Sequence, residues 1–194
     1  SINFFGVNLG VVINQFKTLE QTLPPLSMNT QLTTAARLHS QDMFNNIFQS
    51  HYSSDNPISP NEAGDSLGDR VRHQGYNFMG VGENVFSYAR SAFQSHAAFE
   101  IDWGASPNGI QDPPGHRNNI HNSLFREVGI GVILGTNSSG NGSIGPVIVT
   151  QDFGVKLIGA TPYITGVAYD DQNGSGFYDL GEGLGGINVA VNGS

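Results

Sequence analysis

Residues 171–182 have the spacing of a calcium-binding loop. Side-chain oxygens stand at loop positions 1, 3, 5, 9 and 12, and glycine stands at position 6. In chain order, the expected calcium ligands are Asp171, Asn173, Ser175, the backbone carbonyl of Phe177, Asp179 and Glu182. A hard cation such as Ca²⁺ prefers six to eight oxygen ligands, and the glycine permits the sharp turn that gathers them. The alternative is a solvated Asp/Gly turn that binds nothing.

The residues on either side of this loop predict strands. Residues 163–169 and 186–191 both alternate in the manner of half-buried strands rich in β-branched residues. An EF-hand switch needs a helix on each side of its loop. We therefore exclude a calcium switch and expect a calcium-stiffened β-hairpin, which implies a compartment outside the cell, where calcium is plentiful.

A second possible site involves His51, Glu83 and His116. Two neutral imidazoles suit zinc or another divalent cation of similar softness. A nearby carboxylate could orient a histidine or hold a metal-bound water. Each residue taken alone could equally be an ordinary hydrogen-bonded side chain, because a lone histidine is more often structural than a ligand.

The elements that must position these residues follow from hydrophobic spacing and from glycine and proline. Helices are expected at residues 11–19, 32–48, 66–74, 87–103 and 117–123, and Asn29 or Thr30 can cap the second of them. Residues 76–82 predict a loop or short strand. Strands are expected at 128–134 and 144–153, joined by a hairpin tip at 135–143. Helices first and strands later indicate an α+β layered fold.

Several short motifs occur together in a fixed order. They are Leu32–Met43, Ser50-His51, Gly68–Val71, Gly82–Val85, Gly115–Ile120, Val128–Gly131 and Thr150–Gly154. In this order they resemble a bacterial CAP (SCP-like) domain, of the superfamily that includes cysteine-rich secretory proteins, venom antigen 5 and plant pathogenesis-related proteins. The resemblance covers about residues 8–156 and implies a three-layer α-β-α sandwich with a central cavity.

The resemblance also implies a set of cavity residues. Family members line the cavity with two His and two Glu, and several bind a divalent cation through the two His. The histidines correspond to His51 and His116, and one glutamate corresponds to Glu83. The second glutamate is missing, because Ser106 stands at its usual position. Its role could fall to Glu100, on the apolar side of the predicted helix, or to Asp102 on the polar side. Glu100 is the better cavity candidate, unless it only pairs with His96 one turn earlier.

The C-terminal residues resemble a different family. The calcium-loop spacing, followed by residues 181–187, is similar to the start of the B-type β-sandwich repeats of serine-aspartate-repeat adhesins, in which the loop holds structural calcium. We therefore expect a CAP domain at 1–158 and the beginning of a β-sandwich, a short all-β calcium-loop segment, at 159–194. A chain that starts at Ser1 without Met is expected to be a piece of a longer protein.

Composition narrows the classes of partner. The net charge is −8, without a basic stripe, so nucleic acid is not an expected partner. The chain has no cysteine, which excludes disulfides and thiolate metal sites. No apolar run approaches the length of a membrane span. We expect an extracellular monomer, secreted or on the cell surface, that meets an unidentified extracellular ligand or surface component.

Two classes of function agree with these features. The first is a binding or structural module with a metal-tuned cavity, displayed beside an adhesin-like β-domain. The second is a metal-dependent, peptidase-like hydrolase in which Glu83 and Glu100 are the cavity acids. We favour the first, because two protein ligands are few for catalytic zinc, which usually has three.

Overall fold

A computed structural model describes residues 6–19, 23–140, 142–158 and 163–190. The chain divides into two units, Ser1–Thr161 and Pro162–Ser194. In the first unit the helices are α1 (Leu9–Lys17), α2 (Thr30–Asn46), α3 (Leu67–His73), α4 (Ala92–Ile101) and α5 (Gly115–Ile120). The strands are β1 (Ser27–Met28), β2 (Phe78–Ala89), β3 (Glu127–Leu134), β4 (Asn137–Ser139), β5 (Gly142–Ile144) and β6 (Val147–Lys156).

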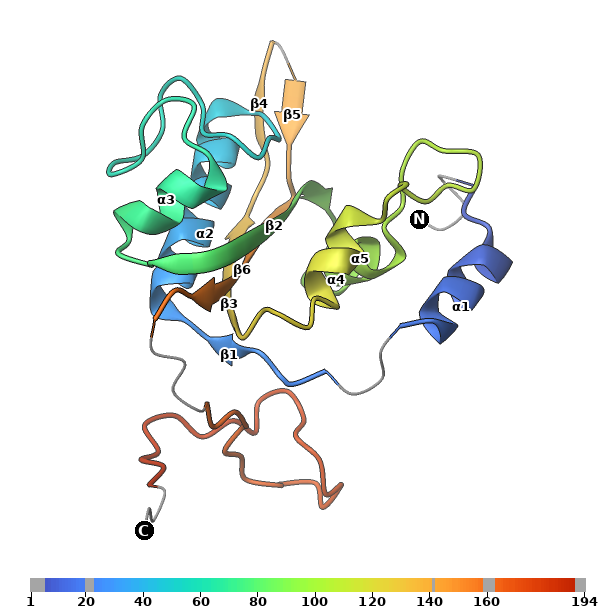
Figure 1. Cartoon of the computed structure of the whole chain (residues 1–194), viewed down its shortest axis with the longest axis vertical. Coiled ribbons are helices and arrows are strands. Elements are labelled where there is room, and N and C mark those ends of the chain that lie inside the picture. The colour runs from blue at the N-terminus through green and yellow to red at the C-terminus, as the bar shows by residue number, and fades with distance from the viewer. Residues whose placement is uncertain (1–5, 20–22, 141, 159–162, 191–194) are drawn as a thin grey trace. The chain divides into compact units, whose positions relative to one another are not determined.

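Four strands form the main sheet, in the order β1-β3-β6-β2 (Figure 1). Only the β1–β3 pair is parallel, and β6 is antiparallel to both β3 and β2. The order leaves β2 with a free edge. The strands β4 and β5 form a separate hairpin between β3 and β6, so the expected hairpin tip is drawn out into a ribbon.

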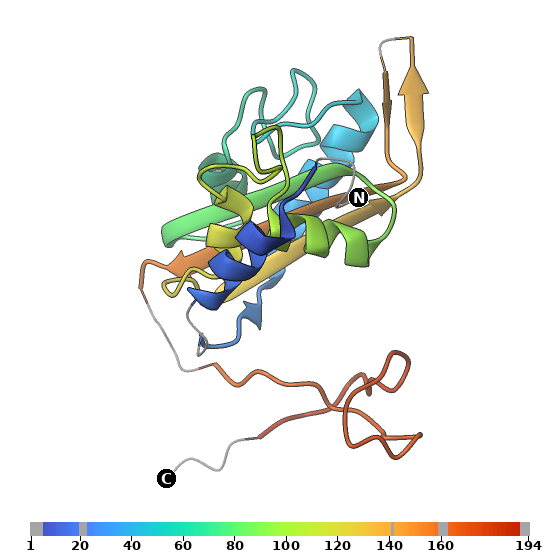
Figure 2. The same cartoon turned by 90° about the vertical axis from the view of Figure 1, so that its right-hand side faces the viewer.

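Helices cover both faces of the sheet (Figures 1 and 2). Alternate residues of β6 separate the two interfaces, as the two-residue period of a strand requires. Ile148 packs with Met43 of α2 on one face, whereas Val149 packs with Phe99 of α4 on the other. The mixed α+β class expected from the sequence is confirmed.

The long helix α2 fits closely against β3 because β3 contributes glycines to the interface. A Cβ at Gly129 would collide with the backbone of Leu32 and Thr33, and a Cβ at Gly131 with the backbone of Ala36. Asn29 begins the helix, because its side chain accepts hydrogen bonds from the amides of residues 31 and 32. The Asn29 cap thus fixes where α2 begins, and the glycines of β3 allow α2 to pack closely on the sheet from its first turn.

Two predicted boundaries were wrong. Residues 76–82 were expected to form a loop or short strand, but β2 continues to Ala89, and the helix predicted from residue 87 begins only at Ala92. The glycines and buried polar residues of β2, Glu83 and Asn84 among them, conceal the usual strand pattern. Ser91 then caps α4 through the amide of Gln94.

No membrane-spanning helix occurs among the described residues. The longest of these helices, α2, has 17 residues and includes Asp42 and Arg37.

The C-terminal unit, described for residues 163–190, contains no strand in that range. A single bridge joins Tyr169 to Gly183, so the two expected strands are not formed there, and Val191 lies outside the described residues. Strands need a paired neighbour and an apolar face to bury. Here the apolar side chains of Ile164, Phe177 and Leu180 are exposed.

Candidate functional site

The first half of the candidate site is a buried ion pair under His51. Nδ1 of His51 donates to Oε1 of Glu83 at 2.8 Å, and the guanidinium of Arg70 contacts Oε2 of Glu83 at 2.5 Å. The side chains of Glu83 and Arg70 are 2% and 0% exposed, whereas that of His51 is 55% exposed. Glu83 therefore holds the imidazole of His51 through Nδ1, and the Nε2 side of the ring faces solvent.

The electrostatics of Glu83 follow from this pairing. Burial alone would raise the pKa of Glu83, but the hydrogen bond from His51 and the charge of Arg70 outweigh it and hold the pKa below its usual value. His39 lies nearby, with Nε2 3.9 Å from Oε2 of Glu83. Burial lowers the pKa of His39 despite the opposing charge of Glu83, so His39 is neutral at pH 7. Glu83 is therefore an ionised carboxylate whose counter-ion is Arg70.

The loop after α2 is held firmly, and this determines where His51 lies. Asp42 of α2 accepts hydrogen bonds from both the amide and the hydroxyl of Ser54, at 2.9 and 2.6 Å. Nε2 of His39 bonds to the carbonyl of Ser50 at 2.8 Å, and Arg70 donates to the carbonyl of His51 at 3.0 Å. The chain on both sides of the His51 side chain is therefore tied to α2 and α3.

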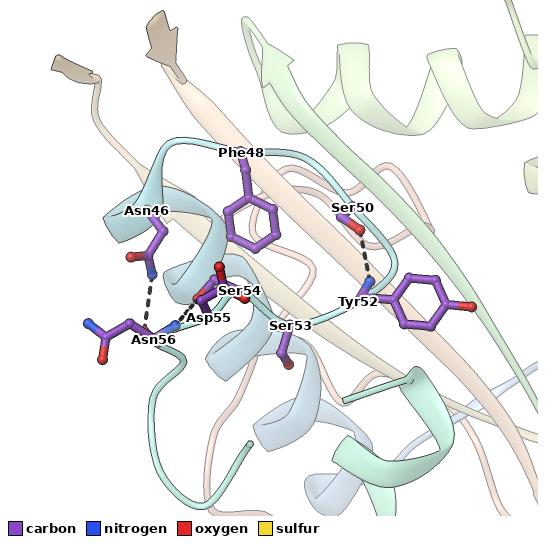
Figure 3. Close-up of a pocket in the computed structure, with 8 residues that line it drawn as sticks. All are labelled: Asn46, Phe48, Ser50, Tyr52, Ser53, Ser54, Asp55 and Asn56. Atoms are coloured by element: carbon purple, nitrogen blue, oxygen red, sulfur yellow. Dashed lines mark hydrogen bonds between the residues drawn. The ribbon is translucent and has the colours of Figure 1, made fainter. Parts of the chain in front are cut away.

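The same loop borders a shallow polar hollow of about 380 Å³ (Figure 3). Its lining residues are Asn46, Phe48, Ser50, Tyr52, Ser53, Ser54, Asp55 and Asn56. Several of their polar groups bond to one another: Ser50 accepts from the amide of Tyr52, and Asn46 donates to the carbonyl of Asn56. The hollow is a by-product of the loop's internal bonding, and His51 does not line it.

The second half of the site is His116. Nδ1 of His116 donates to Oδ1 of Asp102 at 2.7 Å, and the side chain of Asp102 is fully buried. Oδ2 of Asp102 accepts from the amide of Arg117 at 3.2 Å. The ring of His116 stacks at a tilt on Phe99, with the ring centroids 5.2 Å apart. Like His51, His116 is oriented by a buried carboxylate on Nδ1.

Glu100 was ranked above Asp102 as the second cavity acid, but it is Asp102 that contacts a site histidine. Glu100, taken as the better cavity candidate, bonds to His121 at 2.9 Å and lies 3.8 Å from His96, the pairing kept as its alternative. Asp102 meets His116 instead, because it is the C-cap of α4 with a left-handed backbone (φ 57°). A residue in that conformation leaves the helical wheel, so the polar side assigned to Asp102 did not apply.

Both halves contact β2, through the neighbouring residues Glu83 and Asn84. Glu83 supports His51, and the next residue, Asn84, donates to the carbonyl of His116 at 3.1 Å. A cleft of about 180 Å³ lies there, lined by Gln49, Val85, Phe86, Ala98, Phe99, Trp103, Gln111 and His116. Gln49 belongs to the loop that carries His51. Strand β2 therefore contacts the side chain of His51 through Glu83 and the backbone of His116 through Asn84.

The structure adds residues that sequence reasoning did not assign to the site: Arg70, His39 and Asp152. All three lie within motifs that suggested the family, but no role followed from the motifs. A pattern that could have revealed them is a charged residue inside an apolar stretch, such as Asp152 within the strand Val147–Lys156. Such a residue is costly to bury unless it has a partner.

The calcium-loop residues form one hydrogen-bonded network. Asp171 accepts from the amides of Ser175 and Gly176, at 3.0 and 2.9 Å, and Glu182 accepts from the amides of Gln172 and Asp179, at 3.1 and 2.9 Å. The hydrogen bonds from Asn173 and Ser175 lower the pKa of Asp179. The hydroxyl oxygen of Ser175 also lies 3.0 Å from the carbonyl oxygen of Phe177, as an alternative acceptor for the same proton. All six expected calcium ligands thus belong to this network.

Within the described part of the chain, no group of three or more His, Cys, Asp or Glu side chains is arranged to hold a metal ion. A cation held by His51 and His116 would therefore complete its shell with water. In the C-terminal loop, the carboxylates face the loop's own amides in this structure.

Comparisons with solved structures concern the fold. The chain resembles in fold an extracellular protein containing an SCP domain from Bacillus anthracis, with a TM-score of 0.50 and 23% sequence identity over 75% of this chain and 37% of that one. The chain thus spans little more than a third of that protein.

Two further structures are similar at lower scores. An outer surface protein from Borrelia burgdorferi matches at 15% identity and a TM-score of 0.46, over 76% of this chain and 88% of that one. A cysteine-rich secretory protein from Staphylococcus aureus matches at 15% identity and a TM-score of 0.41, over 76% and 37%. A comparison with curated proteins found no significant match.

The family comparison is the decisive one. The model of the cysteine-rich secretory protein (CAP) family matches residues 12–153, which include both histidines, Glu83, Asp102 and all of the main sheet except the end of β6. The chain itself contains no cysteine, so no disulfide holds its fold. This chain is a member of the CAP family.

Proposed function

We propose that this protein is an extracellular CAP module, secreted or displayed on the cell surface, that binds a divalent cation, zinc by preference, through His51 and His116. The observation that carries the proposal is that each histidine has its Nδ1 bonded to a buried carboxylate. Metal-binding histidines usually donate their second ring nitrogen to such a partner, which sets the tautomer and raises the basicity of the free nitrogen. Nε2 is then the ligand on both residues.

The residues present fit such a cation. Among the described residues, neither Nε2 atom takes part in a hydrogen bond. The buried acids cannot swing out to solvent, so both imidazoles keep their orientation without the metal. Zinc, when bound, would supply a Lewis acid and a polarised water. Phe99 and Trp103 form an apolar wall of the cleft beside this position.

The same geometry favours binding over hydrolysis. A hydrolase needs a general base that can accept a proton near neutral pH. Glu83 has both oxygens engaged, by His51 and Arg70, and its pKa is held low, so Glu83 is a poor base. Glu100 is occupied by His121. The peptidase-like alternative therefore lacks an available acid among the two residues that suggested it.

The test is a zinc titration of calcium-loaded protein at pH 7.5 by calorimetry. We expect one weak site per chain, lost in His51→Ala and in His116→Ala. The matched control is His96→Ala, because His96 is an exposed histidine on α4 that contacts neither of the two site histidines. Zinc binding that survives in both site variants would refute the assignment.

We also propose that residues 171–182 bind calcium and that this C-terminal segment belongs to an adhesin-like β-domain. Support comes from the common network of the six expected ligands and from the positive φ of Gly176 (75°), which only glycine adopts readily. Calcium would replace the loop's internal bonds with metal–oxygen bonds and stiffen the segment. Limited proteolysis with and without chelator, read at residues 163–190, tests this role.

A further inference from the structure

Asp152 is the buried acid that the site described so far does not use. It lies in the middle of β6, fully buried, directly across from Glu83 of β2. Its cross-strand neighbour on the other side is Gly129 of β3, which has no side chain. Neither carboxyl oxygen of Asp152 has a hydrogen-bonding partner among the described donors. A carboxylate in such a place would be an uncompensated buried charge.

The charge of Arg70 partly offsets the effect of burial on the pKa of Asp152, but no described group is hydrogen-bonded to the carboxyl oxygens of Asp152. Glu83 is the nearest, and it is ionised and paired with Arg70. Arg70 of α3 uses its two terminal nitrogens on Glu83 and on the carbonyls of His51 and Asp65. His39 of α2, the remaining group, is kept neutral by burial. One positive charge therefore faces two buried carboxyl groups.

Two buried, ionised carboxylates on directly paired residues can only accept hydrogen bonds, so they repel each other unless one carries a proton. A single proton on one of the two acids removes both the charge repulsion and the lack of a donor. It neutralises that acid and lets it donate a hydrogen bond to the other. Burial and the neighbouring Glu83 carboxylate raise the pKa of Asp152 well above its usual value, which assigns the proton to Asp152. Glu83, bonded by His51 and Arg70, keeps the charge.

We propose that Asp152 is a positioning residue that stays protonated at neutral pH and donates a hydrogen bond to Glu83, which holds that carboxylate in place for His51. Asp152 touches neither histidine and acts only through Glu83. This inference concerns the same site as the proposed function. The protonation of Asp152 and the tautomer of His51 can nevertheless both be observed in the metal-free protein.

The expected pH dependence has a definite sign. An aspartate whose pKa is raised in the folded protein stabilises it relative to high pH, fully so below the unfolded pKa, and this stabilisation is lost as pH rises through the folded pKa. Asp152→Asn keeps a hydrogen-bond donor and never ionises. It should remove this alkaline loss. Asp152→Ala removes the hydrogen bond that Glu83 accepts from Asp152.

The experiment is carbon and nitrogen NMR on the metal-free chain, with unfolding measured across pH 5–9. We expect the Asp152 carboxyl resonance to be that of a protonated acid at pH 7, and His51 to be the Nδ1–H tautomer in wild type and Asp152→Asn but mixed in Asp152→Ala. An ionised Asp152 at pH 7, or a His51 tautomer equally disturbed in both variants, would overturn the proposal. If Asp152→Ala does not fold, the carboxyl resonance of wild type and the alkaline profile of Asp152→Asn still decide it. This experiment uses no zinc. A failure of zinc binding in the separate titration would therefore count against the proposed function and not against the role of Asp152.

Discussion

Replacing Arg70 by methionine should be among the most damaging single changes to the CAP domain. Methionine has a similar length but no charge and no donors. It would leave the buried carboxylate of Glu83 without its counter-ion and the carbonyl of His51 without its 3.0 Å hydrogen bond. The carbonyl of Asp65 would be less affected, because it also accepts from the amide of Ser53 at 2.9 Å. The damage therefore centres on Glu83.

The magnitude follows from the burial of both partners. Breaking a buried ion pair by removing one partner costs about 3–5 kcal/mol, because the other charge remains buried. Typical domain stabilities are roughly 5–15 kcal/mol, so Arg70→Met should remove a large share of the total. The double variant Arg70→Met/Glu83→Gln should cost clearly less than the sum of the single changes, since no buried charge is left in it.

Urea unfolding followed by the fluorescence of Trp103 suits this test, because Trp103 is the single tryptophan and lies in the first unit. Arg72→Met is the matched control on the same helix. Its ion pair with Asp69 is 3.6 Å long, the arginine side chain is 59% exposed, and its loss should change stability by about 1 kcal/mol or less. A cost for Arg70→Met no greater than that of the control would refute the ion-pair argument.

Three further predictions follow from other parts of the chain. Asp171→Ala should make residues 163–190 protease-sensitive in calcium, as chelator does, whereas Asp170→Asn, a neighbour outside the ligand set, should not; equal sensitivity of both variants would contradict the loop assignment. Acidification should release zinc first, near pH 6, because protons compete for imidazole nitrogens, and calcium only near the carboxyl range at about pH 4, as measured by metal analysis after dialysis. Simultaneous release of both metals would argue against two separate sites. Gly131→Ala should destabilise the domain by about 1–3 kcal/mol or more in urea unfolding, because its Cβ meets the α2 backbone, whereas Gly115→Ala, with open space around it, should be nearly neutral.

Much of the scaffold could be predicted from local patterns. The long helix α2 and its Asn29 cap, and the strands β3 and β6, have regular apolar spacing and ordinary turn residues, so sequence and structure agree on them. The extent of β2 could not be predicted in this way. Its centre is Gly82-Glu83-Asn84, and Glu83 and Asn84 are buried by the site they build rather than by an apolar face.

The residues that support the site were also only partly predictable from local sequence patterns. His51 and Glu83 were expected to lie together, and the structure places them in contact. Asp102 could not be ranked correctly, because a helical wheel assumes helical backbone and Asp102 has left its helix. Asp152 of β6 is far from Glu83 in sequence, and Arg70 of α3 precedes Glu83 by 13 residues, so only the strand pairing and the helix packing reveal that both lie beside it.

The central claim is that one cation lies between His51 and His116. X-ray absorption at the zinc edge of the zinc- and calcium-loaded protein tests it most directly. The account predicts two imidazole nitrogens at about 2.0–2.1 Å, with oxygen atoms completing the shell. His116→Ala should remove one of the two imidazoles or abolish binding. A zinc shell made only of oxygen atoms, or one with two imidazoles that is unchanged in His116→Ala, would contradict the claim.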